Sequence, residues 1–179
     1  MWFRGLMKVT LCLDVGFCSM GIAIWSPDQG CFIHTDVIKT APTPKKERGY
    51  ACYENTRRCR ELAKGLRTLF LSYNIQAVVG EFPHGGAQNQ KAAVGMALAT
   101  ATAYLVFYLK GIPVFIIRPD EIKAVVARTK KVTKEQVIKF ARQLYGIGLI
   151  PRDSSAEHIA DAMVCIEVAR QRLPRYLYE

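Results

Sequence analysis

The stretch Val9–Asp14, VTLCLD, is a short apolar run that stops on a carboxylate and is followed by a glycine-containing turn. The stretch Ala77–Glu81, AVVGE, repeats this arrangement and leads into a glycine-rich loop. Apolar runs of this length are typical of strands buried in a parallel sheet, and ligands gather where such strands end. We therefore expect Asp14 and Glu81 to converge at one edge of a sheet.

A third acid, Asp161, lies on a helical stretch, EHIADAMVCIEVA, with His158 one turn before it. The chain also carries 25 Lys and Arg against 15 Asp and Glu, a net charge of +10. Such an excess favours a nucleic acid or another anionic partner, although a basic chain can be merely soluble. Acids from three separate elements in a basic chain suggest a divalent-metal site that faces a polyanion.

The length of 179 residues predicts one domain, residues 1–179, and the 50% hydrophobic content predicts a globular core. The six cysteines form no CxxC pair and no zinc spacing, which favours a reducing, cytoplasmic compartment. Residues 1–7 are too short for a signal peptide.

Periodicity and turn residues predict five strands and five helices. The strands are expected at residues 8–14, 21–25, 31–39, 75–81 and 112–118. The helices are expected at about 51–73, 88–110, 119–127, 133–145 and from Ser154 or Ser155 to about 172. The first three strands form an antiparallel meander. This order is ribonuclease H-like: an α/β fold with a mixed five-stranded sheet flanked by helices.

The stretch Ala92–Leu109 contains no charged residue and is almost as long as the ~20 apolar residues that span a bilayer. Its first half consists mostly of small residues, and strand-like segments flank it. We therefore expect no membrane span. A helix buried in the core, or buried in a subunit interface, is the preferred interpretation, with Ala92–Ala103 as part of a dimer face.

The motifs together resemble the RuvC Holliday-junction resolvases, including their bacteriophage relatives, over roughly residues 8–170. In that family the first acid ends a strand before a glycine-containing turn, as Asp14 does in LDVGFCSMGIAI. The second acid ends the strand before a long helix, as Glu81 does in VVGEFP. The last acidic positions lie one helical turn apart, and HIADAM places His158 and Asp161 there.

The resemblance also implies DNA-binding residues. Two lysines bracket a basic loop in the family, and IKAVVARTKKVTKEQ has the same pattern. An aromatic residue shortly after the second acid stacks on a base, a role for which Phe82 and His84 are the candidates here. The DNA contacts are therefore expected at Lys123, Arg128, Lys130, Lys131, Lys134, Phe82 and His84. The run of lysines could also be only a solvated face.

The function implied by the resemblance is a structure-selective endonuclease that resolves four-way DNA junctions by paired symmetric nicks, leaving 5′-phosphates. A homodimer would present two active sites to the two opposed strands, in a bacterial or bacteriophage-infected cell. Two Mg²⁺ ions about 3.5–4 Å apart perform such chemistry, and Mn²⁺ could replace them. Asp14 would bridge both ions, with Glu81 on one and Asp161 on the other. His158 would bind metal or act as a base.

Other interpretations stay open. Asp14 could be a turn residue, Glu81 a loop acid and His158 a residue of the helix surface. Glu157 or Asp153 could replace one of the proposed helix ligands. A non-catalytic branched-DNA-binding relative, or a fragment of an actin-like phosphate-binding ATPase, would use the same fold. The ATPase class needs two such domains, for which 179 residues are too few, and the intact acids argue against a non-catalytic relative.

Overall fold

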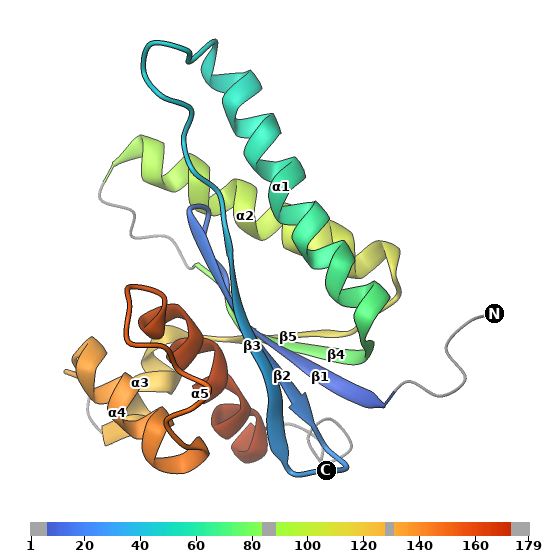
Figure 1. Cartoon of the computed structure of the whole chain (residues 1–179), viewed down its shortest axis with the longest axis vertical. Coiled ribbons are helices and arrows are strands. Elements are labelled where there is room, and N and C mark those ends of the chain that lie inside the picture. The colour runs from blue at the N-terminus through green and yellow to red at the C-terminus, as the bar shows by residue number, and fades with distance from the viewer. Residues whose placement is uncertain (1–6, 84–88, 128–130, 173–179) are drawn as a thin grey trace.

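The sheet contains five strands, with three antiparallel neighbours followed by two strands parallel to the first (Figure 1). The computed structural model describes residues 7–83, 89–127 and 131–172. Across the sheet the strands run in the order β3 (Cys31–Lys39), β2 (Ser19–Ser26), β1 (Lys8–Asp14), β4 (Asn74–Glu81) and β5 (Val114–Ile117). The predicted meander and the predicted mixed sheet are confirmed.

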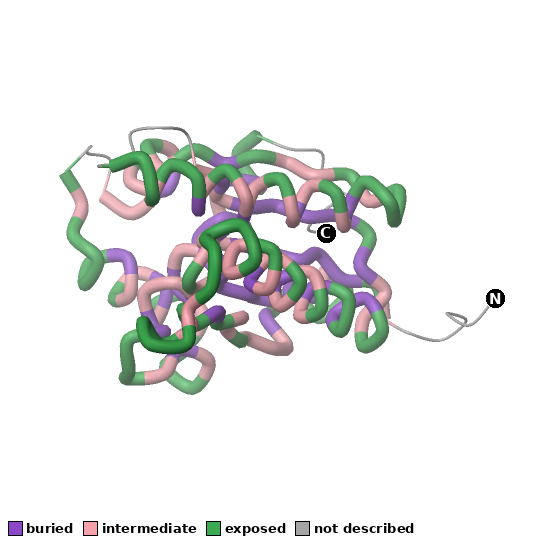
Figure 2. The backbone as a smooth tube through the Cα atoms, turned by 90° about the horizontal axis from the view of Figure 1, so that it is seen from above, coloured by how far each residue is buried: buried purple, intermediate pink, exposed green. Residues whose placement is uncertain are grey.

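Helices cover both faces of this sheet (Figure 1). The helices α1 (Ala51–Ser72) and α2 (Gln90–Leu109) lie on one face. The helices α3 (Pro119–Ala127), α4 (Lys134–Tyr145) and α5 (Ala156–Arg172) lie on the other. Buried residues concentrate on the central strands and the inner sides of the helices (Figure 2).

The strand β1 shows why its sequence is apolar throughout. Leu11 and Leu13 belong to the core shared with α1 and α2, whereas Cys12 belongs to the core shared with α5. All three are fully buried. Alternate residues of a strand point to opposite faces, so a strand covered on both sides needs apolar residues at every position. Asp14 follows in this alternation on the face that α5 covers.

The ends of the helices follow local chemistry. Thr133 precedes α4, and its hydroxyl accepts a hydrogen bond from the backbone N–H of Gln136, while the Gln136 side chain accepts from the backbone N–H of Thr133. This reciprocal capping satisfies two otherwise unpaired donors. Pro119 opens α3, as its fixed backbone angle suits a first helical turn.

The helix α2 is less buried than the sequence predicts. Its buried residues are Gly95, Ala99, Ala103 and Phe107, while Leu105 and Tyr108 are exposed. Among the helices of the described residues, α2 alone has the length and composition to cross a membrane. It connects β4 to β5, which are neighbouring parallel strands, and it packs on α1. A crossover helix of this kind lies against its sheet.

Candidate active site

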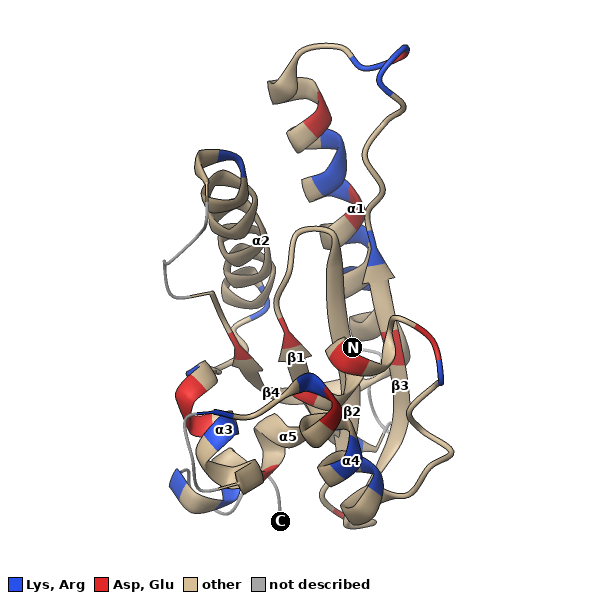
Figure 3. Ribbon diagram, turned by 90° about the vertical axis from the view of Figure 1, so that its left-hand side faces the viewer, with Lys and Arg blue, Asp and Glu red and all other residues tan. Residues whose placement is uncertain are grey.

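The sheet brings two acids together at the ends of neighbouring strands. Asp14 and Glu81 are register partners in the parallel ladder of β1 and β4. The backbone N–H of Val15 donates to the carbonyl of Glu81 at 3.0 Å, which keeps the two strand ends aligned. Figure 3 shows acidic residues at both strand ends. The convergence of Asp14 and Glu81 is confirmed.

The helix α5 adds two side chains from above this edge. His158 Nδ1 lies 2.7 Å from Asp14 Oδ2, across 144 residues of sequence. Asp161 is one turn later on the same helix, and its charge acts on Glu81. The four predicted residues therefore meet at one place, built from β1, β4 and α5.

Gly21 of β2 makes this close approach of α5 possible. Gly21 is the register partner of Asp14, and a Cβ atom at position 21 would lie 2.0 Å from the backbone oxygen of His158. Any side chain at position 21 would therefore push α5 away from the sheet. Gly21 is a functional residue beyond those predicted from the motifs, although a glycine inside a predicted strand is a recognised sign of close backbone approach.

Burial and mutual repulsion make the acids hard to ionise together. Burial raises the pKa of Glu81 to about 8, with the charges of Asp14 and Asp161 adding to the rise and Lys123 opposing it. Burial likewise raises the pKa of Asp161 to about 7, reinforced by Asp14 and Glu157 and opposed by His158 and Lys134. Neighbouring carboxylates behave in this way when positive charge is insufficient.

His158 supplies part of that positive charge. Its hydrogen bond to Asp14 raises the pKa of the imidazole, burial acts in the opposite direction, and Glu157 and Asp161 reinforce the rise. The protonated form of His158 is therefore favoured beside Asp14. An imidazole in this state cannot bind metal or accept a proton, so either role requires His158 to lose its proton first.

The residue types fit a divalent cation, but their arrangement is not that of a finished site. Carboxylate oxygens are the ligands that Mg²⁺ prefers, and the raised pKa values show a demand for positive charge. Within the part of the chain that is described, no three His, Cys, Asp or Glu side chains are placed so that they could hold a metal ion. The bond between His158 and Asp14 occupies one carboxylate oxygen. Binding a metal would require these side chains to turn.

Two predicted lysines lie beside the acids. Lys134 Nζ is 2.5 Å from Glu157 Oε1, and this contact is the main reason that the pKa of Lys134 is raised. Lys123 acts electrostatically on Glu81. Glu157 is thus paired with a lysine, and Asp153 accepts a hydrogen bond from the backbone N–H of Ser155 at 2.8 Å. Neither alternative acid replaces His158 in contact with Asp14.

The other predicted DNA contacts fall into three groups. Arg128, Lys130 and His84 lie outside the described residues, and Lys131 is exposed. Phe82 differs from the expectation that it stacks on a base, because its side chain is only 2% exposed. The centroid of its ring lies 5.0 Å from that of Tyr104, which packs against the core. The Phe82 side chain follows the strand alternation onto the face opposite Glu81, which removes it from any DNA surface in this structure.

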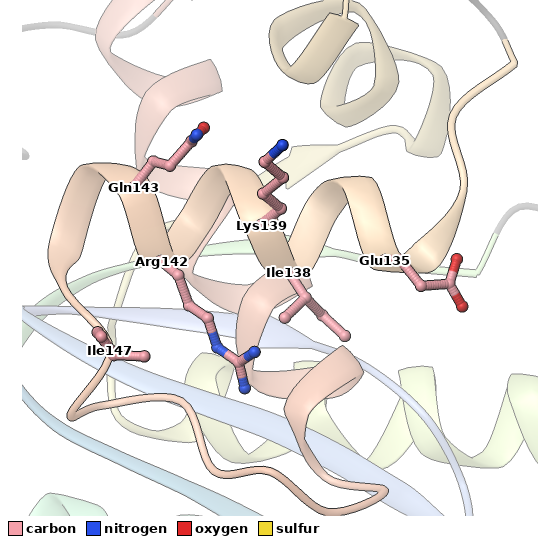
Figure 4. A pocket seen from close by; sticks show the side chains of 6 residues that line it. All are labelled: Glu135, Ile138, Lys139, Arg142, Gln143 and Ile147. Atoms are coloured by element: carbon pink, nitrogen blue, oxygen red, sulfur yellow. The ribbon is translucent and has the colours of Figure 1, made fainter.

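A hollow of about 500 Å³ on α4 is separate from the acids. Its lining residues are Glu135, Ile138, Lys139, Arg142, Gln143 and Ile147. Figure 4 shows that their side chains point in different directions and do not converge on one spot. Functional groups that bind a ligand converge, so we assign no function to this hollow.

Known proteins share this arrangement of elements. The family model of crossover junction endodeoxyribonuclease RuvC matches residues 11–169. Among solved structures, Thermus thermophilus RuvC in complex with a Holliday junction substrate is 20% identical, with coverage of 91% of this chain and 95% of that chain and a TM-score of 0.69. The yeast mitochondrial Holliday junction resolvase Ydc2 is 12% identical, with coverage of 92% and 79% and a TM-score of 0.59.

A second structure of Thermus thermophilus RuvC is 22% identical, with coverage of 91% and 96% and a TM-score of 0.66. A comparison with curated protein sequences gives no match. The structural similarities establish a ribonuclease H-like fold, and the family model spans most of the chain. The chain belongs to the RuvC family of crossover junction endodeoxyribonucleases and is a Holliday junction endonuclease.

Proposed function

We propose that Asp14, Glu81, His158 and Asp161 form the metal-dependent catalytic site with which this endonuclease nicks a four-way junction. The observation that carries the proposal is the convergence of these four side chains at one sheet edge. The raised pKa values of Glu81 and Asp161 fit a cluster of carboxylates that binds cations. Two Mg²⁺ ions, or Mn²⁺ in their place, would stabilise the charge on the attacking and leaving oxygens of the phosphodiester.

The position of each residue suggests which metal ion it would hold. Asp14 lies centrally, in contact with His158 and within the electrostatic reach of both other acids, which suits a ligand shared by two ions. Glu81 would hold an ion from the strand, and Asp161 would hold one from the helix. Neutral His158 would bind metal or accept a proton from the attacking water.

Basic side chains around the acids would hold the junction. Lys123 and Lys134 already act on Glu81 and Asp161, so they stand where the backbone of a bound strand would pass. Exposed Lys131 would extend this surface, and we keep Arg128, Lys130 and His84 as proposed contacts of the same loops. Contacts of this kind position DNA without reading its sequence.

A homodimer through α2 would supply the second active site. The exposed side of α2 carries Val94, Ala97, Ala101, Leu105 and Tyr108, spaced at three or four residues. Figure 3 shows α2 as an almost uncharged helix beside the charged α1. An exposed apolar stripe is typical of a subunit interface, and a two-fold dimer matches a junction that needs two symmetric cuts. All six cysteines are free thiols, which suits the cytoplasm of a bacterium or of a phage-infected cell.

The test is a nicking assay on a synthetic four-way junction, with the matching linear duplex as control substrate. We expect symmetric nicks in opposed strands, with Mg²⁺ or Mn²⁺ required and with 5′-phosphate ends. Binding of the junction without cleavage under all metal conditions would favour the non-catalytic relative. ATP hydrolysis without cleavage would favour the phosphate-binding ATPase class.

A further inference from the structure

A cavity of about 800 Å³ opens between the N-terminal parts of α1 and α2 and reaches His158. The turn between β1 and β2 forms its floor, with Phe17 among the lining residues. Its volume lies within the range of about 300–1,000 Å³ that is usual for ligand sites. None of the roles proposed for the acids and the lysines requires this cavity.

Arg58 of α1 is the unusual residue in the wall of the cavity. It is only 6% exposed, and its guanidinium lies 4.0 Å from the centroid of the Phe17 ring. Arg58 Nε donates to Thr40 Oγ1 at 2.9 Å, and Nη2 donates to the carbonyl of Phe17 at 3.2 Å and to that of Thr40 at 3.3 Å. Nη2 also lies 3.0 Å from the sulfur of Cys18. Every one of these partners is uncharged.

No carboxylate within the described ranges forms an ion pair with Arg58. Its second terminal nitrogen, Nη1, has no hydrogen-bond acceptor among the same residues and is not sealed inside the protein. Burying a guanidinium without a negative partner costs free energy. An anion in the cavity would remove that cost and could accept from Nη1.

The remaining charges of the wall also favour an anion. Arg48 and Lys91 line the cavity and add positive charge. Glu54 is the acid in the wall, and its carboxylate is already bound by Arg57 at 2.9 Å and by the backbone N–H of Thr43 at 2.9 Å. Glu54 therefore offers little repulsion to a bound anion.

We propose that this cavity receives a nucleotide of the cleaved strand, with Arg58 bound to a phosphate other than the scissile one. This inference rests on the proposed active site, because the cavity and the acids share His158. The wall has the mixed character that a nucleotide needs, with apolar Phe17 and Met96 for a base and the amide of Asn55 for a polar edge. A guanidinium is a favoured phosphate ligand, because its planar donors match two phosphate oxygens.

The test is a scan of the junction with single neutral methylphosphonate linkages, placed at each position on both sides of the cut. Binding is measured in EDTA for the wild-type protein and for Arg58→Gln. We expect one linkage to weaken wild-type binding by about tenfold, the effect of losing one charged hydrogen bond. The same linkage should have no effect on Arg58→Gln, while every other linkage affects both proteins equally. Log K for junction binding falls linearly with log salt, and this slope should be shallower by about 0.9 in Arg58→Gln.

Arg60→Gln is the matched control, because Arg60 lies on the same helix, is exposed and does not line the cavity. It should keep the wild-type sensitivity to the critical linkage. If all linkages weaken wild type and Arg58→Gln equally, Arg58 serves only to hold the turn after β1, and the inference is wrong. Junction cleavage by the wild-type protein is measured separately, so failure of the proposed function would be recognised independently.

A second variant covers the case in which Arg58→Gln does not fold. Ala51 lines the cavity and is exposed at the start of α1, so Ala51→Trp should fill part of the cavity without disturbing the core. We expect nicking to fall by about tenfold or more at an unchanged melting temperature. Its neighbour Cys52 is exposed and does not line the cavity, so Cys52→Trp should nick at the wild-type rate. Equal rates for Ala51→Trp and Cys52→Trp would overturn the inference.

Discussion

The helices α5 and α2 lie on opposite faces of one sheet and use their apolar residues in opposite ways. α5 buries ten of its seventeen residues and holds His158 and Asp161 against β1 and β4. α2 has the more apolar sequence, yet only four of its twenty residues are buried in the single chain. Hydropathy therefore does not decide which helix is central. The buried helix α5 holds His158 and Asp161 against the sheet, and the exposed apolar helix α2 is the proposed dimer face.

The largest effects are expected where α5 meets the strand ends. Asp14→Asn or Glu81→Gln should lower the nicking rate by at least about two to three orders of magnitude, because each removes a charge needed around the scissile phosphate. Junction binding should change little, since basic side chains hold the DNA. Nicking and filter binding of each variant check this. A folded variant that nicks at a near-normal rate would remove its residue from the site.

His158 on α5 should show the next effect. His158→Asp should retain substantial activity with Mg²⁺, since it completes an all-carboxylate set, and His158→Ala should lose more activity with Mg²⁺ than with Mn²⁺.

Wild-type nicking should rise with pH through a pKa above 6.5, because Asp14 raises the pKa of His158 and only the neutral imidazole is active. His158→Asp should move this acid limb to lower pH. The pH–rate profiles of nicking by the three proteins, each with Mg²⁺ and with Mn²⁺, test the role of His158. Equal rates for wild type and His158→Ala would show that His158 takes no part in catalysis.

The other helix should respond through assembly. Leu105 is 57% exposed on α2, and Leu105→Lys should shift a micromolar dimer to monomer and uncouple the two nicks. Its effect on the folding of the single chain should be small, within about 0.5 kcal/mol. Leu71→Lys, at a residue 68% exposed on α1, is the matched control and should stay dimeric. Sedimentation of the three proteins separates these outcomes. A wild-type protein that is monomeric with and without DNA would contradict the dimer.

Gly21→Ala tests the contact that seats α5. The added Cβ would meet the His158 carbonyl, so α5 must move, at a cost of roughly 1–3 kcal/mol in the free energy of unfolding. A melting temperature lower by about 2–4 °C per kcal/mol should accompany slower nicking. Gly49→Ala is the control, because nothing lies within 4 Å of a Cβ at that position. Unchanged melting and nicking in Gly21→Ala would show that the contact is unimportant.

The contrast between the helices also explains what the sequence could predict. Asp14 and Glu81 were predictable because alternation and strand ends are local signals, and His158 and Asp161 because helical spacing places them together. The sequence alone did not predict the close contact at Gly21, the buried position of Arg58 or the burial of Phe82. Each depends on packing between elements far apart in sequence, such as β2 against α5 or α1 against the turn after β1. The exposure of α2 could not be predicted either, because composition does not show which side of a helix packs against the rest of the chain.

The central claim is that the four clustered side chains bind divalent metal, and calorimetric titration with Mn²⁺ tests it most directly. The pKa is raised to about 8 for Glu81 and to about 7 for Asp161, so at neutral pH the folded protein holds most of a proton on Glu81 and about half of one on Asp161. Metal must displace these protons, so its affinity should rise from pH 6 to pH 8, by up to about tenfold per pH unit for each proton released. The same shifts predict that the protein without metal loses stability as pH rises through this window, because the unfolded chain binds fewer protons there. We predict strong, pH-dependent binding by the wild-type protein and its loss in Glu81→Gln. Equal Mn²⁺ affinity in both proteins, or affinity independent of pH, would contradict a metal site built from these residues.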